Sequence, residues 1–139
     1  MNRLHLIALP LCCWLSLVAN AEPGSPPDPN TLNWVLPVRS TRLSPGAVPP
    51  RALSLQGMTP LFLVGQDAAS VEWLSRHAQA LQELGANGLA VEVDDVRALR
   101  RIQTAAPGLN VWPVSGDDIA ERLELEHYPV LITPTGLEQ

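Results

Sequence analysis

The chain has 139 residues, 46% of them apolar, which is enough for one domain with a hydrophobic core. It contains no lysine, and once Arg3 is set aside within an N-terminal leader, eight arginines face fourteen acidic residues, a formal charge of −6. This acidic balance argues against direct binding to nucleic acid or anionic lipid, because phosphate binding depends on cationic contacts.

Residues 1–21 have the pattern of a cleavable signal peptide. Arg3 supplies the cationic start, residues 4–19 form an apolar stretch, and residues 19–21 read Ala-Asn-Ala, an A-x-A cleavage site. The alternative is an uncleaved anchor, but the apolar stretch is shorter than the ~20 residues that a membrane-spanning helix needs. We therefore expect export, a mature chain starting at Glu22, and no transmembrane segment after cleavage.

Both cysteines, Cys12 and Cys13, lie in this leader. A lipid-anchored cysteine would follow a small residue, whereas Leu11 precedes this pair, so we interpret both as apolar filler. The mature protein is then free of cysteine. It can form no disulfide, carry no thiolate nucleophile and hold no cysteine-ligated metal, even in an oxidising compartment.

Residues 22–59 form a proline-rich arm. Its prolines predict that it holds no helix and at most a brief strand, such as residues 33–38. Such an arm can be disordered or lie along a domain, and three apolar residues indicate that part of it docks: Trp34, Val35 and Leu36. A loose basic patch in the arm is read as a solvated stretch, or at most a partner contact: Arg39, Arg42 and Arg51.

From residue 60 onward, apolar runs and turn signals alternate regularly. Residues 60–65 predict a buried strand that ends at a glycine, and Asp67 predicts the N-cap of a helix to residue 84. Gly85 is suited to the left-handed position that closes this helix. Its apolar face is expected to comprise Val71, Leu74, Ala78 and Leu81.

A second strand-helix pair follows. Residues 88–93 predict a strand with alternate residues on one face, namely Leu89, Val91 and Val93. Asp94 or Asp95 is expected to cap a helix that ends before the Pro-Gly pair at 107–108. Residues 109–115 predict a third strand.

The last unit is shorter. Ser115 and Asp118 have the spacing of a capping box, which starts a brief helix to Leu123, and residues 129–133 predict a final strand before a Pro-Thr-Gly turn. Alternating strands and helices predict parallel pairing with helices on both faces of one sheet, hence a three-layer α/β domain over residues 60–139. The final strand is expected to run antiparallel if it enters at an edge.

The final strand begins at a proline, which cannot donate a ladder hydrogen bond. We therefore predict that the Tyr128-Pro129 peptide is cis and lies against a functional edge. The order of elements, with Tyr128-Pro129 before the last strand and Gly65, Gln66 and Asp67 before the first helix, resembles the thioredoxin fold. That resemblance implies a thioredoxin-like domain whose cis-proline faces the start of the first helix, here without the Cys-x-x-C motif and therefore without oxidoreductase chemistry.

Longer stretches carry a more specific resemblance. The segments PVRSTRLSPGAVPPR, PLFLVGQD, LGANGLAVEVDD, VSGDDIAERLELEHYPVLI and TPTGLEQ together resemble a family of exported proteins encoded on integrating conjugative elements. The order of elements is also distantly similar to the family of pilus-assembly proteins of F-type conjugative plasmids, which are periplasmic, thioredoxin-like and not enzymes. The resemblance implies a periplasmic role in conjugative DNA transfer, with protein components of the secretion or pilus machinery as partners.

The predicted site is a groove between Gln66 and Asp67 on one side and Tyr128 and Pro129 on the other, where a partner segment would bind, either to the groove alone or to the groove together with the proline-rich arm. The alternative for Tyr128-Pro129 is that a cis-proline only shapes the entry of the strand. Trp73 lies off the main apolar stripe, so it belongs either to a second core face or to an exposed partner anchor. We assign no catalytic residue, cofactor or metal.

Three other features favour structural roles. His77, expected to be exposed or half-exposed, is fifty residues from His127 with no third metal ligand implied. The pairs at 94–95 and 117–118 are expected to cap helices, although paired carboxylates also suit a hydrolase or calcium. A chaperone that holds exported pilin subunits is a further alternative to an adaptor, and the sequence does not separate the two.

Overall fold

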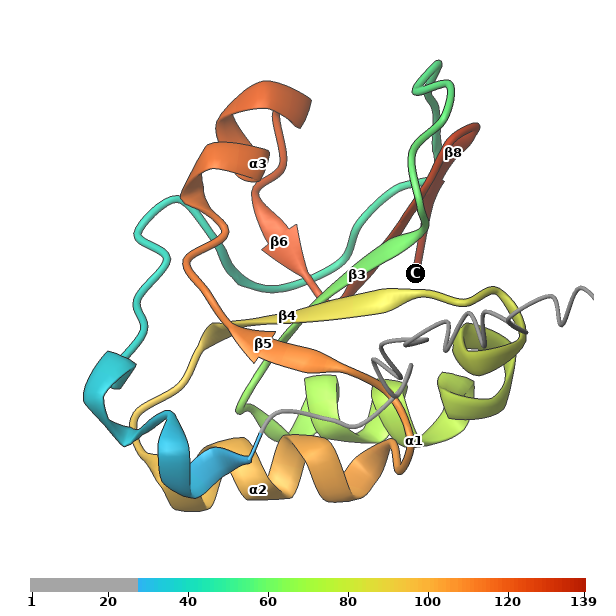
Figure 1. Ribbon diagram of the computed structural model, residues 1–139. Coiled ribbons are helices and arrows are strands. Elements are labelled where there is room, and N and C mark those ends of the chain that lie inside the picture. The colour runs from blue at the N-terminus through green and yellow to red at the C-terminus, as the bar shows by residue number, and fades with distance from the viewer. Residues whose placement is uncertain (1–27) are drawn as a thin grey trace, which may run out of the picture.

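A computed structural model describes residues 28–139; the predicted signal peptide and the first residues of the arm lie outside this range. One mixed six-stranded sheet has the order β2-β8-β7-β3-β4-β5 (Figure 1). Its strands are β2 (Arg51–Ala52), β3 (Leu61–Gly65), β4 (Asn87–Glu92), β5 (Val111–Pro113), β7 (Val130–Thr133) and β8 (Gly136–Glu138). The helices are α1 (Ala68–Glu83), α2 (Val96–Ala105) and α3 (Asp117–Leu123).

The helices cover both faces of the sheet, as predicted. α1 and α2 lie side by side on one face, where they bury a cluster that includes Phe62, Trp73 and Leu99. α3 and part of the arm lie over the other face, where a second cluster includes Leu43 and Tyr128. The protein is therefore an α/β domain of three layers. No helix between residues 28 and 139 is long and apolar enough to cross a membrane.

The helix ends follow the local signals in the sequence. The Asp67 carboxylate accepts a hydrogen bond from the Ser70 backbone N–H at 3.0 Å, and Gly85 has a φ of 65°, so both predicted ends of α1 are confirmed. At α2 the carboxylate of Asp95 caps the helix by accepting from the Ala98 N–H at 2.9 Å. Its neighbour Asp94 is free to make other contacts.

The pairing of the last strand differs from the expected one. β3, β4 and β5 are parallel, whereas β7 runs antiparallel to β3 and lies in the interior of the sheet rather than at an edge. The chain turns back at residues 134–135 so that β8 pairs with β7, and β2 then pairs with β8. The sequence analysis missed β2 and β8, because two- and three-residue strands carry almost no periodic signal.

A register shift alters the predicted face of β4. Val64 pairs with Ala90 but Gly65 pairs with Glu92, so Val91 is an extra residue in the ladder. Beyond this bulge the alternation is reversed, and Val93 packs in the cluster beneath α1 and α2 while Val91 packs in the other. The expectation that Leu89, Val91 and Val93 share one face is therefore wrong for Val93.

The arm begins with two 3₁₀ turns, η1 (Pro29–Thr31) and η2 (Asn33–Val35), within the described residues. η2 lies where the strand at 33–38 was predicted, and of those residues only Val38 forms a β-bridge, to Val93. Asp28 accepts from the Asn30 N–H, and Pro29 occupies the first position, where a proline is tolerated. Leu36 packs on the first cluster, whereas Trp34 is 82% exposed and does not dock.

Candidate functional site

The turn at residues 65–67 and the Tyr128-Pro129 junction meet at one rim of the sheet. A Cβ atom added to Gly65 would lie only 2.4 Å from Cε2 of Tyr128, so the tyrosine ring packs directly on the Gly65 backbone. The Tyr128-Pro129 peptide is cis, as predicted. A second cis peptide, Leu36-Pro37, was not predicted. The prediction that residues 65–67 and residues 128–129 lie together, although about sixty positions apart in the chain, is therefore confirmed.

Tyr128 is buried at this rim, with 3% of its surface exposed. Burial raises the pKa of its phenol to about 12, and the negative charges of Asp67 and Glu92 contribute to the rise. The phenol therefore stays protonated near neutral pH. Tyr128 shapes the rim as a neutral packed side chain and is not placed to act as a base or a nucleophile.

The arm lies along the rim where the sequence analysis predicted an open groove for a partner segment. β1 (Ser44–Pro45) pairs parallel with β6 (His127–Tyr128), directly before the cis-proline. The Ser44 N–H donates to the Glu126 carbonyl at 3.0 Å, and the Gly46 N–H donates to the Tyr128 carbonyl at 3.1 Å. This is strand addition by a segment of the same chain.

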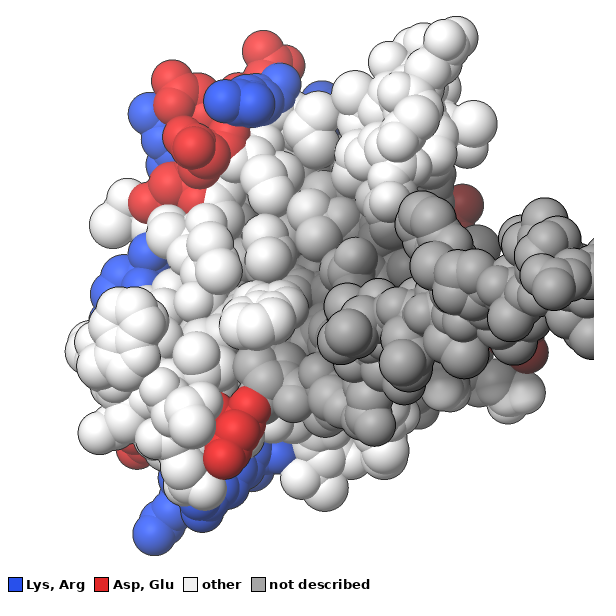
Figure 2. Space-filling model, in the orientation of Figure 1, with Lys and Arg blue, Asp and Glu red and all other residues white. Residues whose placement is uncertain are grey.

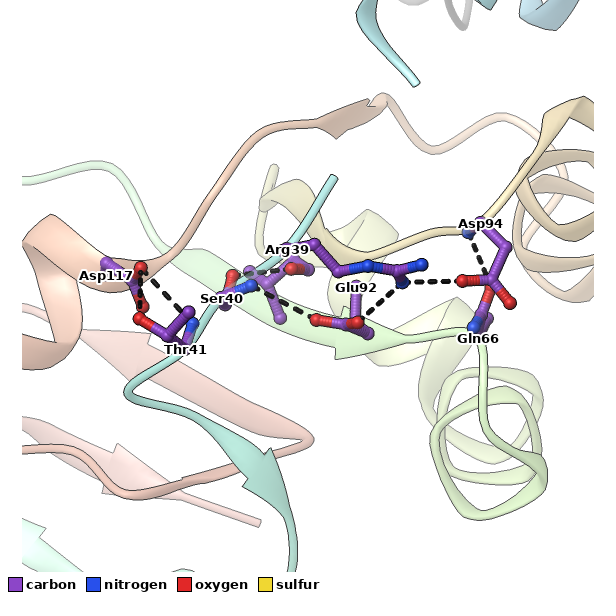
Figure 3. A network of polar contacts seen from close by, with 8 residues as sticks. Arg39, Ser40, Thr41, Gln66, Glu92, Asp94 and Asp117 are labelled. Atoms are coloured by element: carbon purple, nitrogen blue, oxygen red, sulfur yellow. Dashed lines mark hydrogen bonds and ion pairs between the residues drawn. The ribbon is translucent and has the colours of Figure 1, made fainter. Parts of the chain in front are cut away.

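One end of the docked arm is held by charged groups (Figure 3). The Arg39 guanidinium lies 2.7 Å from a carboxylate oxygen of Glu92 and 2.5 Å from one of Asp94. The hydrogen bond from Arg39 lowers the pKa of Asp94, and the two carboxylates raise the pKa of Arg39. Gln66 closes this end, because its side-chain carbonyl accepts from the Asp94 N–H at 2.8 Å.

The middle of the docked segment is held by Ser40, one of two buried polar residues in the described range. Its hydroxyl donates to the Val91 carbonyl and accepts from the Gly116 N–H at 2.9 Å. Its own N–H donates to Glu92 at 3.1 Å. Ser40 therefore links the arm to both β4 and the start of α3.

Asp117 holds the far end of the same segment, opposite Asp94 in Figure 3. Its carboxylate accepts from the backbone N–H of Arg42 at 2.9 Å and from the N–H and hydroxyl of Thr41 at 3.2 Å. These bonds, the one from Arg42 first, lower the pKa of Asp117. The predicted capping box at Ser115 and Asp118 is wrong, since α3 begins at Asp117 after Gly116 without a side-chain cap.

The acidic pairs thus have distinct roles. Asp95 caps α2 as expected, whereas Asp94 and Asp117 bind the arm at opposite ends of the network, and Asp118 is exposed. The hydrolase alternative required these carboxylates to converge in one pocket. Within residues 28–139, no group of three or more His, Cys, Asp or Glu side chains is placed to hold a metal ion.

His127 contacts the arm at Ser44. Its Nδ1 lies 3.1 Å from the Ser44 hydroxyl and 3.2 Å from the Ser44 carbonyl oxygen. An Nδ1 that carries a proton donates to either oxygen, whereas an Nδ1 without one accepts from the hydroxyl. In both tautomers the ring links β6 to β1.

Four of the five predicted site residues, Gln66, Asp67, Tyr128 and Pro129, surround the rim, and Trp73 does not. Trp73 is 4% exposed and packs 6.4 Å from Phe62, ring centre to ring centre, so the interpretation as an exposed anchor is wrong. His77 is half-buried, and its Nδ1 lies 2.7 Å from the Trp73 carbonyl oxygen.

The sequence analysis missed the residues of the arm that bind the rim. The arginines in the arm were expected to be solvated, or at most to contact a partner. All three are exposed, and each also contacts the domain: Arg39 pairs with two acids, Arg42 lies 3.8 Å from Glu121, and Arg51 donates to the Leu123 carbonyl. The available signal was the sequence Arg-Ser-Thr-Arg at 39–42, in which every side chain can form a hydrogen bond. A partly open depression remains beside the docked segment, lined by Arg39, Thr41, Ser44, Glu92 and Tyr128, among others.

Comparison with known proteins gives a family. No curated protein and no solved structure matches the chain significantly. The family described as "Protein of unknown function (DUF2859)" matches residues 15–137, which is most of the chain. The match includes the arm that docks at the rim as well as the sheet and its helices. The chain therefore belongs to the family described as "Protein of unknown function (DUF2859)".

Proposed function

We propose that this protein is a thioredoxin-like, non-catalytic adaptor or assembly component of a conjugative DNA-transfer apparatus. It is exported to the periplasm and acts by binding protein components of the secretion or pilus machinery. The conjugative setting rests on the resemblance of the sequence to exported proteins of integrating conjugative elements. The thioredoxin-like assignment rests on the order of elements and on the cis-proline beside the start of α1.

The observation that carries the proposal is the rim itself. An extended segment is bonded to the strand before the cis-proline, and residues 28–139 contain no cysteine that could form a mixed disulfide there. The rim therefore has the geometry to bind an extended peptide but, within residues 28–139, no thiol that could oxidise or reduce one. The open depression beside the arm gives a partner access to Thr41 and Ser44.

In-cell crosslinking tests the proposal. A photoreactive residue replaces Ser44 at the rim, with replacement of the exposed Gln79 on α1 as the matched control. In cells that carry the conjugative element, the rim position is expected to capture one identified component of the transfer apparatus, and the control position is not.

Capture of the same protein from both positions, or of none from Ser44, contradicts a specific adaptor site at the rim. Capture of many unrelated exported proteins from Ser44 supports a chaperone instead. Tyr128 and Trp73 are unsuitable positions for the test, because both are buried and their replacement disturbs the core.

A further inference from the structure

The exposed side of α2 concentrates positive charge on an otherwise acidic protein. Arg97, Arg100 and Arg101 are all exposed and lie within five consecutive positions, although the chain has only nine cationic residues and a net charge of −5. Arg100 donates to the side chain of Asn30. In the described part of the chain, none of the three lies within ion-pair distance of a carboxylate.

All three arginines border a shallow groove between α1 and α2. Val71 and Ser75 line it from α1, and Arg97, Arg100, Arg101, Thr104 and Ala105 line it from α2. Arg97, Arg101 and Ala105 are spaced four apart, which places them on one side of that helix. Val71 and Ala105 also pack against the hydrophobic cluster beneath, so the floor of the groove is small and apolar.

The charge of this surface differs from that of the opposite layer. Figure 2 shows blue side chains at the lower edge of the molecule, over the part occupied by α2 in Figure 1, and a group dominated by red ones over α3. The groove lies on the face of the sheet away from α3 and the docked arm, because its floor belongs to the cluster under α1 and α2.

We propose that the groove between α1 and α2 is a docking surface for an acidic amphipathic helix of a partner protein. An apolar ridge on that helix, repeating at i, i+3, i+4 and i+7, fills the floor over Val71 and Ala105. Carboxylates flanking the ridge pair with Arg97 and Arg101, for which guanidinium geometry is well suited. Charge complementarity and an apolar floor together define this occupant.

Other occupants would match only one of the two features of the groove, its arginines or its apolar floor. The acidic α3 of a second copy offers carboxylates, but its apolar side chains, Ile119 and Leu123, already pack against its own second cluster. Nucleic acid or a lipid headgroup offers phosphate to the arginines but leaves the apolar floor empty and meets a net negative protein. A partner helix is the occupant that uses both features.

This surface is separate from the rim and does not depend on the proposed function there. The rim binds an extended segment and the groove binds a helix, so one molecule can hold two components at once. A negative crosslinking result at Ser44 would therefore not contradict the proposal for the groove. A negative result in the binding test below would not contradict the proposal for the rim.

Binding of a synthetic peptide tests the groove. The probe is a labelled peptide of about 18 residues, or five helical turns, with leucine and alanine at the apolar spacing and glutamate on the flanks. Its affinity for the purified full chain is measured by fluorescence anisotropy at low salt and at about 0.15 M salt. The Arg97→Gln/Arg101→Gln variant is expected to bind about tenfold more weakly, since each exposed ion pair contributes modestly.

Matched controls separate docking from general charge and from loss of fold. Arg76→Gln/Arg122→Gln removes the same charge from exposed positions outside the groove and is expected to keep the wild-type affinity. Ser75→Glu places a carboxylate in the groove and is expected to weaken binding, whereas Gln79→Glu on the same helix is not. Far-UV circular dichroism verifies that each variant is folded.

Three results would overturn the inference. One is equal affinity of the wild type and the Arg97→Gln/Arg101→Gln variant. Another is equal binding of a peptide in which every glutamate is replaced by glutamine. The third is binding of anionic phospholipid vesicles or of duplex DNA through Arg97 and Arg101 without binding of the acidic peptide.

Discussion

Ser40 and Asp117 fix the arm by hydrogen bonds that a side chain makes to backbone groups. Ser40 is 3% exposed and connects the Val91 carbonyl with the Gly116 N–H, two groups more than twenty residues apart. Asp117 accepts the N–H groups of both Thr41 and Arg42. The Asp117 bonds hold backbone groups of the arm, so they specify the position of the chain at residues 41–42. Ser40 instead binds backbone groups of the domain through its own side chain.

Ser40→Ala leaves the Val91 carbonyl and the Gly116 N–H without their buried partner. An unsatisfied buried polar group costs about 1–3 kcal/mol, so the free energy of unfolding is expected to fall by that amount. Urea denaturation measures the change. Ser54→Ala, at an exposed serine of the arm, is the control and is expected to change stability by less than about 0.5 kcal/mol. An equal effect of the two variants would show that the Ser40 bonds do not stabilise the fold.

Asp117 gives the arm a dependence on pH. Hydrogen bonds to its charged form hold its folded pKa below the value of about 3.9 for an unfolded aspartate. The resulting stabilisation is complete above that value and is lost as the pH falls through the lower, folded pKa. Asp117→Asn should therefore be less stable than the wild type at neutral pH, and the difference should shrink in acid.

Urea midpoints recorded from about pH 6 down to about pH 2 measure this difference across the window in which an aspartate titrates. Asp118→Asn serves as the control, because that exposed carboxylate binds no described part of the arm. A stability difference for Asp117→Asn that stays constant at every pH would contradict the assignment.

At the scale of elements, the arm behaves as a strand of the domain. β1 pairs with β6, Leu43 is 7% exposed within the second cluster, and Gly116 approaches it so closely that an added Cβ would lie 2.8 Å from the Leu43 side chain. The polar network fixes the segment around Ser40, and Leu43 anchors it in the core. Burial of one leucine side chain supplies about 1.5–3 kcal/mol, more than an exposed ion pair does.

Leu43→Ala is therefore expected to release β1. Loss of a buried leucine costs about 2–5 kcal/mol, and the amide hydrogens of Ser44 and Gly46, which bond to β6, should exchange faster with solvent. Hydrogen-exchange measurements at these two amides detect the change. Trp34→Ala removes a larger side chain that is 82% exposed, so it should leave both exchange rates unaltered. Accelerated exchange in both variants would place the anchor elsewhere.

At the scale of the whole molecule, the arm and the sheet share one core. Leu43 and Val48 from the arm are buried with residues of β3, β4 and β7, and Val38 is buried where it forms a bridge to Val93. We therefore expect the arm and the domain to unfold together in one transition. Fluorescence of Trp73, with Trp14, Trp34 and Trp112 replaced by phenylalanine, reports on the core, and amide exchange at Gly46 reports on the arm. A lower urea midpoint for the arm than for the core would contradict a shared core.

The sequence by itself determined the local structure of this protein. The apolar spacing and the capping residues Asp67 and Asp95 defined α1 and α2, and the proline before β7 indicated the cis peptide at the rim. These features were accessible because caps, helical periodicity and proline geometry depend on residues only a few positions apart. The exclusion of thiol chemistry from residues 28–139 also follows from the sequence alone.

Only the tertiary structure decided how distant segments pair. It placed β7 antiparallel inside the sheet, reversed the face of Val93 by a bulge, buried Trp73, and laid residues 38–46 across the predicted groove. Ser40 and Val91 are 51 residues apart in the chain, and Arg42 and Asp117 are 75 apart. Contacts between such distant residues depend on which apolar and hydrogen-bonding groups are still exposed once the helices and strands have formed. A pattern of neighbouring residues in the sequence does not contain that information.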